Sequence, residues 1–576
     1  MFNNIIYFIV VLLIFNVSYS GSRPESPLIQ TLMMLFLSWL AFAGCCRWGF
    51  QGLMKRYQAG TAEGGLAAAY QTLNLRLSVL AIFLFALDIY IFQVKYWIQA
   101  IPGLASFSVL QGILGLAIFM FYLCTVWYFS HSVYREAFHT NIGRRAFVLS
   151  HVKFNVPILF PWMILSFISD LLSLSPWSTP DSFLNKPMGQ MAYFAGFLIV
   201  LMIFMPLVIQ YWWGCSPLDP SEKVKALRDF LRDQGFRYRA LLLWPIFQGR
   251  MMTAGIMGVV ARYRYILVTK GLMEILSTEE LKGVLAHEMG HAKYRHLVFY
   301  MVFFFGFMVV SFGLFDLCVY FFASQSFFID ILENAESQAT SLFYMAVSFP
   351  ILLAMVIYFR FVMGFFMRNF ERQADLFSAT TMGSPTPAIT SLEKIAFLSG
   401  KSRALPSWHH FSIKERVDYL WRSEREPGLV KRHDRFVARS IVIYLVTIAG
   451  LGYFLNFGPL KEGIEAWKLR QEMQAYERII QVDPAQSLAY NNLAWYLATA
   501  PYEELRDPPR AIHLAKRAVE LEPLPMYLDT LAEAYYANGQ YDKAVKVIEK
   551  AISNAKERRD YYEGQLKKYL KAMEKQ

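Results

Sequence analysis

Long apolar runs constrain this chain more than any other feature of its sequence. A short run over 5–15 is followed by longer ones at roughly 29–50, 75–94, 107–129, 153–175, 190–213, 298–322, 342–366 and 440–457. Most of them approach the roughly 20 residues that a helix needs to cross a bilayer. With 56% hydrophobic and 17% charged residues among 576, the chain is too apolar for an ordinary soluble protein and too long for one domain. The sequence therefore predicts a mainly α-helical polytopic membrane protein with soluble parts.

The distribution of Lys and Arg predicts an orientation. Basic residues gather around 47–76 and 135–153, whereas the intervening loops have little beyond Lys95 and Lys186. By the positive-inside rule the basic side is cytoplasmic, and the same alternation places 215–296 on that side. We expect a bacterial inner membrane protein. The formal charge of +12 lies beside apolar segments, so we expect contact with the lipid bilayer and no nucleic acid.

The first apolar run leaves two alternatives open. It is followed by Ser18-Tyr19-Ser20-Gly21, which has the small residues of a signal-peptidase site, but no basic residue precedes it. A cleaved signal peptide and a first transmembrane helix both fit. The five cysteines lie in or at the ends of apolar segments, without a zinc-ligand spacing or a disulfide framework, so we expect them to serve in packing.

The stretch from Leu281 to His296 has the pattern of a metal site. Within it, His287, Glu288 and His291 spell H-E-x-x-H. On a helix, residues four apart share a face, so the two imidazoles can bind one cation while Glu288 faces the water that the cation holds. The preceding segment, 277–280, has the form of a capping box, which predicts that the motif lies on a helix. This pattern is typical of a zinc metallopeptidase.

A catalytic zinc usually has three protein ligands, so a third one is needed. One alternative is His296, which would lie on the wrong side of a continuing helix, at the point where the chain enters the membrane. The other follows the two apolar runs that form a hairpin, where Glu371 and Asp375 are four residues apart and share a helix face. Glu371 can bind zinc while Asp375 holds a ligand in place. By itself, E-x-x-x-D is common on solvated helix faces.

With H-E-x-x-H at 287–291 and E-x-x-x-D at 371–375, residues 215–425 resemble the membrane metallopeptidases of the HtpX and CAAX prenyl protease type. The resemblance implies one zinc per chain, with His287, His291 and Glu371 as ligands and Glu288 as the general base. It implies a zinc-dependent endopeptidase in which a metal-activated water attacks a peptide carbonyl. We expect its substrates to be membrane-associated, misfolded or precursor proteins.

Two further stretches match the family in part. His410 and Arg416 keep the spacing of a His and an Arg near the end of the catalytic unit, but the family's Pro after the His is missing. The resemblance implies that one of them steadies the oxyanion or the carboxylate ligand. Thr253, Ala254 and Gly255 stand where the family tends to have Asn-Ala, before a strand-like segment. A small β edge there can pair with a substrate backbone by strand addition.

The C-terminal segment contains an internal repeat. In the segments that begin at Tyr490 and Tyr527, large and small residues alternate at helix-pair positions. These segments look like tetratricopeptide repeats, which predicts an α-solenoid with a concave surface for a protein partner. An unrelated helical bundle is the alternative.

The expected organisation has four parts. A transmembrane region of five or six spans, 1–214, precedes a metallopeptidase unit, 215–436, with the hairpin 298–366 inserted in it. A last membrane helix, 437–458, leads to the repeat domain, 459–576, on the face opposite the cytoplasmic metal site.

Three functions fit these features. The first is an integral-membrane zinc endopeptidase. The second is a repeat-based membrane scaffold or chaperone with an auxiliary or inactive peptidase unit, against which the intact Glu288 argues. The third is an intramembrane protease, which would have its ligands within apolar spans. Because Lys and Arg flank both motifs at the edges of spans, we expect cleavage near the membrane interface instead.

Overall fold

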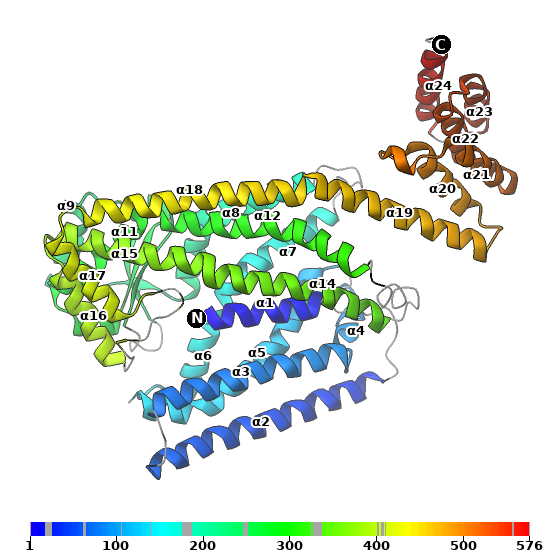
Figure 1. The fold of residues 1–576 in the computed structure, drawn as a ribbon. Coiled ribbons are helices and arrows are strands. Elements are labelled where there is room, and N and C mark those ends of the chain that lie inside the picture. The colour runs from blue at the N-terminus through cyan, green and yellow to red at the C-terminus, as the bar shows by residue number, and fades with distance from the viewer. Residues whose placement is uncertain are drawn as a thin grey trace. The chain divides into compact units, whose positions relative to one another are not determined.

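The fold is known from a computed structural model of the chain (Figure 1). It describes residues 2–17, 26–60, 65–104, 106–138, 140–174, 187–245, 252–323, 325, 337–399, 403–404, 408, 410–555 and 558–574. The expected signal-peptidase site at 18–21 and Lys186 lie outside the described residues. The chain forms two compact units, Met1–Phe315 with Phe322–Gly450, and Asp316–Phe321 with Leu451–Gln576.

Eight of the described helices are long and apolar enough to cross a membrane. Each coincides with one of the eight longer apolar runs. They are Leu28–Gln58, Leu66–Tyr90, Ser108–Ala137, Arg144–Ser173, Gly189–Trp212, His296–Ala323, Met345–Met382 and Leu429–Val482. The short first run forms a helix as well, α1 (Phe2–Val17), which is too short to be counted with them.

The N-terminal helices of the first unit, except α8, share one apolar core. Phe8, Phe85 and Phe119, from three different helices, are fully buried and stack edge to face. The helices after α1 are α2 (Leu28–Gln58), α3 (Leu66–Tyr90), α4 (Val94–Gln99), α5 (Ser108–Ala137), α6 (Arg144–Asn155), η1 (Val156–Leu159), α7 (Phe160–Ser173) and α8 (Pro187–Trp212).

A small sheet follows these helices, in the order β1-β2-β4-β3. Its strands are β1 (Ser216–Pro217), β2 (Ala240–Trp244), β3 (Ala254–Met257) and β4 (Tyr265–Thr269). Every residue of β4 is buried, as expected for a central strand, and β4 runs parallel to β2. Since β3 pairs antiparallel with β4 alone, it is an edge strand, and it lies where the sequence predicts a β edge.

Helices pack around this sheet and continue into the membrane-length segments. The metal motif lies on α11 (Thr278–Lys293), whose Leu281, Leu285 and Met289 are buried in one cluster with residues of the sheet. The other elements of this region are α9 (Glu222–Asp233), η4 (Ala261–Tyr263), α10 (Lys270–Ile275), α12 (His296–Ala323), α14 (Ser337–Ile357), the π-helix η5 (Tyr358–Met363), α15 (Gly364–Met382), α16 (Thr386–Ser399), α17 (Ile413–Arg425) and α18 (Leu429–Asn456).

Three long helices form the frame behind the site. α12, α15 and α18 run side by side (Figure 1). Phe303, Phe366 and Tyr444 pack between them. Phe370, one turn further along α15, is fully buried in the same cluster. The packing therefore fixes the face of α15 that carries Glu371.

The second unit consists mainly of helices with alternating large and small buried residues. Leu493, Leu531 and Tyr535 share its core with Ala494, Ala532 and further alanines. Its helices are α19 (Pro459–Val482), α20 (Ser487–Thr499), η6 (Glu503–Leu505), α21 (Pro508–Leu521), α22 (Pro525–Ala537), α23 (Tyr541–Asn554) and α24 (Arg559–Met573). The assignment of this unit to tetratricopeptide repeats stays a prediction.

Candidate metal centre

The start and the end of α11 set the position of the H-E-x-x-H motif. Ser277 and Glu280 form a capping box, in which the Ser277 Oγ accepts from the Glu280 amide and the Glu280 carboxylate accepts from the Ser277 amide. Lys394 of α16 pairs with the same carboxylate at 2.8 Å. At the other end, Arg295 has a φ of 57°, so the chain turns there and α12 starts at His296. The continuing helix expected from the sequence is thus interrupted between Lys293 and His296.

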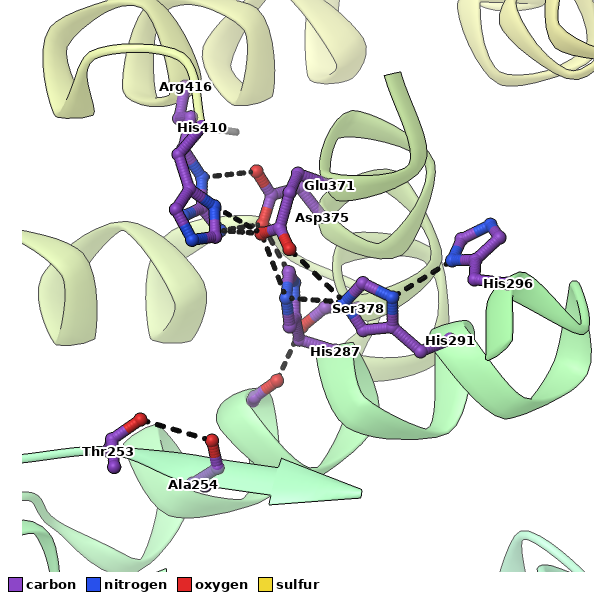
Figure 2. Close-up of polar contacts among 11 residues, drawn as sticks. Thr253, Ala254, His287, His291, His296, Glu371, Asp375, Ser378, His410 and Arg416 are labelled. Atoms are coloured by element: carbon purple, nitrogen blue, oxygen red, sulfur yellow. Dashed lines mark hydrogen bonds and ion pairs between the residues drawn. The ribbon is translucent and has the colours of Figure 1, made fainter. Parts of the chain in front are cut away.

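Three potential ligands converge between α11 and α15 (Figure 2). The Nε2 atoms of His287 and His291 lie 3.2 Å apart. One carboxylate oxygen of Glu371 lies 3.5 Å from His287 Nε2, and the other lies 3.5 Å from His291 Nε2. Glu371 thus faces both imidazoles from across the helix–helix interface.

These separations can be compared with the dimensions of a zinc site. With metal–ligand bonds of about 2.0–2.2 Å, two ligands of a tetrahedral zinc lie about 3.3–3.6 Å apart. The observed distances of 3.2 to 3.5 Å agree with that spacing, and the donor set of two imidazoles and one carboxylate is one that catalytic zinc uses. The residues present therefore fit a zinc ion.

Asp375 and Arg416 hold the first of these ligands from behind. The Asp375 carboxylate accepts a hydrogen bond of 2.9 Å from His287 Nδ1, which directs the Nε2 lone pair toward Glu371 and His291. Arg416 of α17 donates two hydrogen bonds to Asp375, of 2.8 and 2.7 Å, in a bidentate arrangement. Burial alone would lower the pKa of His287, but its contacts with Asp375 and Glu371 raise that pKa.

His410 approaches the site from the segment that precedes α17. Its Nδ1 lies 3.1 Å from Glu371 Oε2, and Arg416 Nη2 lies 3.6 Å from the same oxygen. The His410 side chain is 39% exposed, whereas that of Arg416 is 12% exposed. Of these two residues, His410 is therefore the one that an incoming molecule can reach.

His296 lies behind the second ligand. Its Nδ1 is 2.9 Å from His291 Nδ1, and its Nε2 is 3.0 Å from the Gln373 amide oxygen. Gln373 in turn donates to Asp434 of α18 at 2.7 Å. The His296 ring is buried and stacks on Phe370, with ring centres 4.1 Å apart. Because His296 contacts the far side of the His291 ring, it is neither a third ligand nor a simple polar residue at the membrane boundary.

Glu288 lies between the ligands and the edge strand β3. Burial raises the pKa of its carboxyl, and Glu371 adds to this effect, while His287 and a hydrogen bond from the Ile256 amide act in the opposite direction. Ile256 belongs to β3, so the carboxyl group faces the open edge of the sheet. A proton acceptor with a raised pKa at this position suits general base chemistry.

The edge strand also contains the residues expected to contact substrate. The Thr253 carbonyl accepts from the Thr269 amide at 3.1 Å. In an antiparallel pair, hydrogen-bonded positions alternate, so Gly255 faces β4 while Ala254 faces the open edge. The Thr253 hydroxyl donates to the Ala254 carbonyl at 3.2 Å (Figure 2).

Close packing of α11 against α15 brings the two motifs together. A Cβ placed on Gly290 would lie 3.0 Å from the Ala374 Cα, so the glycine lets the helix backbones approach. Two turns earlier on α11, the Gly283 carbonyl accepts a hydrogen bond of 2.7 Å from the buried Ser378 hydroxyl of α15.

Several residues of this site cannot be identified from the sequence alone. The sequence suggests His296 only as a ligand or a boundary residue, and it does not single out Gln373, Ser378 or Asp434. The spacing of Gln373 and Ser378 relative to Glu371 places them on α15, but nothing in the sequence shows that α18 brings Asp434 to them. Gly290, inside the H-E-x-x-H motif, is a sequence signal for close helix packing.

Comparisons with known proteins bear on this region. Residues 247–445 match peptidase family M48. This segment contains every site residue predicted from the sequence, from Thr253 to Arg416.

Two protease homologues are similar to part of the chain. The chain is 27% identical over 207 residues to a protease HtpX homolog from Thermoplasma acidophilum, covering 35% of this chain and 61% of that protein. It is 24% identical over 234 residues to a protease HtpX homolog from Aeropyrum pernix, covering 39% of this chain and 69% of that protein. The crystal structure of S. mikatae Ste24p matches with a TM-score of 0.45 and 17% identity, covering 69% of this chain and 100% of that chain.

The chain thus spans 61% of the length of the first relative. The matches support the M48 membrane metallopeptidase family and, with the eight membrane-length helices, an integral membrane protein.

Proposed function

We propose that this chain is an integral-membrane zinc endopeptidase. The observation that carries the proposal is the convergence of His287, His291 and Glu371, whose donor atoms lie 3.2 to 3.5 Å apart. Two helices supply them, and a membrane-length hairpin separates these helices in the sequence. In the proposal His287, His291 and Glu371 hold one zinc ion per chain, and Asp375 orients His287.

The reaction is hydrolysis of a peptide bond. A bound zinc supplies the Lewis acidity that polarises a peptide carbonyl and acidifies a water molecule. Glu288 takes the proton from that water as it attacks the carbonyl carbon, and then delivers the proton to the leaving amine. His410, which is exposed beside Glu371, is positioned to donate a hydrogen bond to the developing oxyanion. Arg416 keeps Asp375 and Glu371 in place.

The open edge of β3 can bind the substrate backbone. Ala254 and Ile256 of β3 face away from β4, so the Ala254 amide and the Ile256 carbonyl can pair with an extended peptide, while the Ala254 carbonyl accepts from the Thr253 hydroxyl and the Ile256 amide donates to Glu288. In the proposal, a substrate strand along Thr253, Ala254 and Gly255 passes between β3 and the metal ligands, with its scissile carbonyl near Glu288.

The proposed substrates are proteins at the membrane surface, including misfolded and precursor proteins. The positions of the two motif helices support this part of the proposal. α11 leads directly into the membrane-length α12, and α15 follows α14 of the hairpin, so both motifs lie at the ends of membrane-length segments. The proposed location is a bacterial inner membrane, and the basic loops on the same side of the spans support a cytoplasmic site. The second unit is proposed to bind a protein partner.

Glu288→Gln tests the catalytic assignment. This variant should retain zinc and the wild-type melting temperature, because Glu288 is not one of the ligands, but its kcat on a membrane-protein substrate should fall at least about a hundredfold. Zinc content from elemental analysis and cleavage by the purified protein in detergent measure the two effects. Undiminished cleavage would remove Glu288 as the base.

His287→Ala is the companion experiment for the metal. It should lower the zinc content well below one per chain, because only two ligands remain. A variant with full zinc content would show that the ion binds elsewhere. A repeat-based scaffold, the alternative function, would require normal biological activity from both variants.

A further inference from the structure

A basic cavity lies on another part of α15, at its junction with α17 and α18. Its volume is about 500 Å³. It is lined by Phe365, Arg368, Asn369, Arg372, Phe411, Tyr419, Arg432, His433 and Phe436, which we call the arginine pocket. Three of these residues are arginines, and among the described residues that line it none is acidic. None of them is a proposed zinc ligand.

Arg372 of α15 provides one of the positive charges of the pocket. Its guanidinium lies 3.5 Å from the centre of the Phe411 ring and 4.6 Å from that of Tyr419. The Arg372 Nε is buried and has no hydrogen-bond partner among the described residues. A buried guanidinium nitrogen without an acceptor leaves the Arg372 charge poorly compensated, and because Arg372 lines the cavity, an anion there would compensate that charge.

The neighbouring groups leave the pocket positively charged. Arg368 Nη1 donates to the Trp408 carbonyl at 2.7 Å, which holds the arginine without neutralising it. Arg432 pairs with Glu426 at 2.6 Å, but Glu426 also pairs with Arg422, so one carboxylate serves two arginines.

Two acidic groups near the pocket, Glu415 and Asp375, attract the Arg372 guanidinium electrostatically, but each is also held by other groups. The Glu415 carboxylate accepts hydrogen bonds from Ser412, and Asp375 is held by Arg416. Asp434 accepts from Gln373 and Tyr294. His433 has its Nε2 hydrogen-bonded to the Asn369 carbonyl at 3.0 Å, and its Nδ1 lies 3.4 Å from the Tyr419 hydroxyl.

The surroundings of the pocket indicate a lipid. α15 and α18 are both continuous with membrane-length segments. Phe436 at the rim is 47% exposed, and Phe361, one turn before Phe365, is 62% exposed. An apolar surface of this kind next to clustered arginines matches an acyl chain joined to a phosphate. Basic pockets between membrane helices bind anionic headgroups in this way.

We propose that the arginine pocket binds the phosphate headgroup of an anionic phospholipid, with the acyl chains along Phe361 and Phe436. Arg368 and Arg372 contact the phosphate oxygens, and Arg432 closes the outer side. The site is separate from the peptidase chemistry and stands whether or not that chemistry is confirmed.

Lipid binding to the purified full-length protein tests this proposal. After delipidation in detergent, the protein should bind phosphatidylglycerol at least about tenfold more tightly than phosphatidylcholine, measured by native mass spectrometry. Arg368→Gln combined with Arg372→Gln should remove that preference. Arg425→Gln is the matched control, because this exposed arginine ends α17 and does not line the pocket. Equal affinity for the two lipids, or an unchanged preference in the double variant, would overturn the proposal.

Two further measurements separate lipid binding from phosphate binding and from a loss of folding. If inorganic phosphate alone competes fully with phosphatidylglycerol at the same ionic strength, the pocket is a free-phosphate site and the lipid assignment is wrong. If the double variant does not fold, the wild-type protein is cross-linked to a photoactivatable phosphatidylglycerol in vesicles. Adducts on α15 and α18 within the pocket are expected, and adducts confined to other helices would overturn the assignment.

Discussion

At the scale of single residues, the sequence predicts which side of each histidine faces the metal, but it does not predict what contacts the opposite side of the ring. The side facing the metal follows from H-E-x-x-H, because residues four apart share a helix face. The far side depends on where the chain turns. Arg295 adopts a left-handed conformation that local sequence does not favour for arginine, and this turn directs His296 back onto His291. No periodicity argument contains that information.

His296→Ala tests the importance of this contact. The variant removes the contact between His296 and the Nδ1 of His291, so the His291 ring is no longer held in its orientation. Zinc affinity should therefore fall about 10- to 100-fold, the usual effect of removing a residue that orients a metal ligand. Competition with a chromophoric chelator measures the affinity directly. His513→Ala, on α21 of the second unit, removes a histidine without touching the site and should leave the affinity unchanged. An unaltered affinity in His296→Ala would reduce His296 to a packing residue.

At the scale of secondary-structure elements, the separation of α11 and α15 decides whether Glu371 reaches the histidines. Gly290→Ala should therefore be harmful, although alanine favours helix formation over glycine by about 1 kcal/mol. A Cβ at Gly290 would lie 3.0 Å from the Ala374 backbone, which should push the helices apart and cost about 1–3 kcal/mol of stability. Melting temperature and zinc content should both fall. Gly44→Ala is the control, because a Cβ at Gly44 has no atom within 4 Å, and it should be neutral or stabilising.

The cap of α11 makes the stability of this helix depend on pH. Burial by itself would raise the pKa of Glu280, but Lys394 and Ser277 bring the pKa below its usual value. Its contribution to stability is therefore complete above the unfolded pKa of about 4.3 and is lost as the pH falls through the lower folded pKa. Glu280→Gln should destabilise the protein by about 1 kcal/mol at pH 7, and less as the pH falls below about 4. Melting curves in detergent at several pH values measure this, and a pH-independent difference would contradict it.

At the scale of the whole molecule, the apolar runs predict the long helices because length and composition alone decide whether a segment can cross a bilayer. The catalytic pairing is different. Glu371 and His287 are brought together by packing across a hairpin; the spacing of Glu371 and Asp375 after that hairpin suggested the pairing, and the resemblance of the two motifs to a family made it specific. The arginine pocket could not be predicted at all, because its charges come from α15 and α18 and its aromatic rings include Phe411 and Tyr419 from outside them. Such a site exists only once these elements have packed.

The order of spans predicts on which side of the membrane each soluble segment lies. Because the hairpin consists of two membrane-length helices, α11 and α17 should share one side, and α18 should take the second unit to the other. In a variant without its five native cysteines, single cysteines at Glu279 and Arg425 should react with an impermeant maleimide from the same side, and one at Lys516 from the opposite side. Labelling of inverted and right-side-out vesicles distinguishes the sides. Opposite labelling of 279 and 425 would be incompatible with a metal site formed by α11 and α15, whereas labelling of 516 together with 279 would show that α18 does not cross.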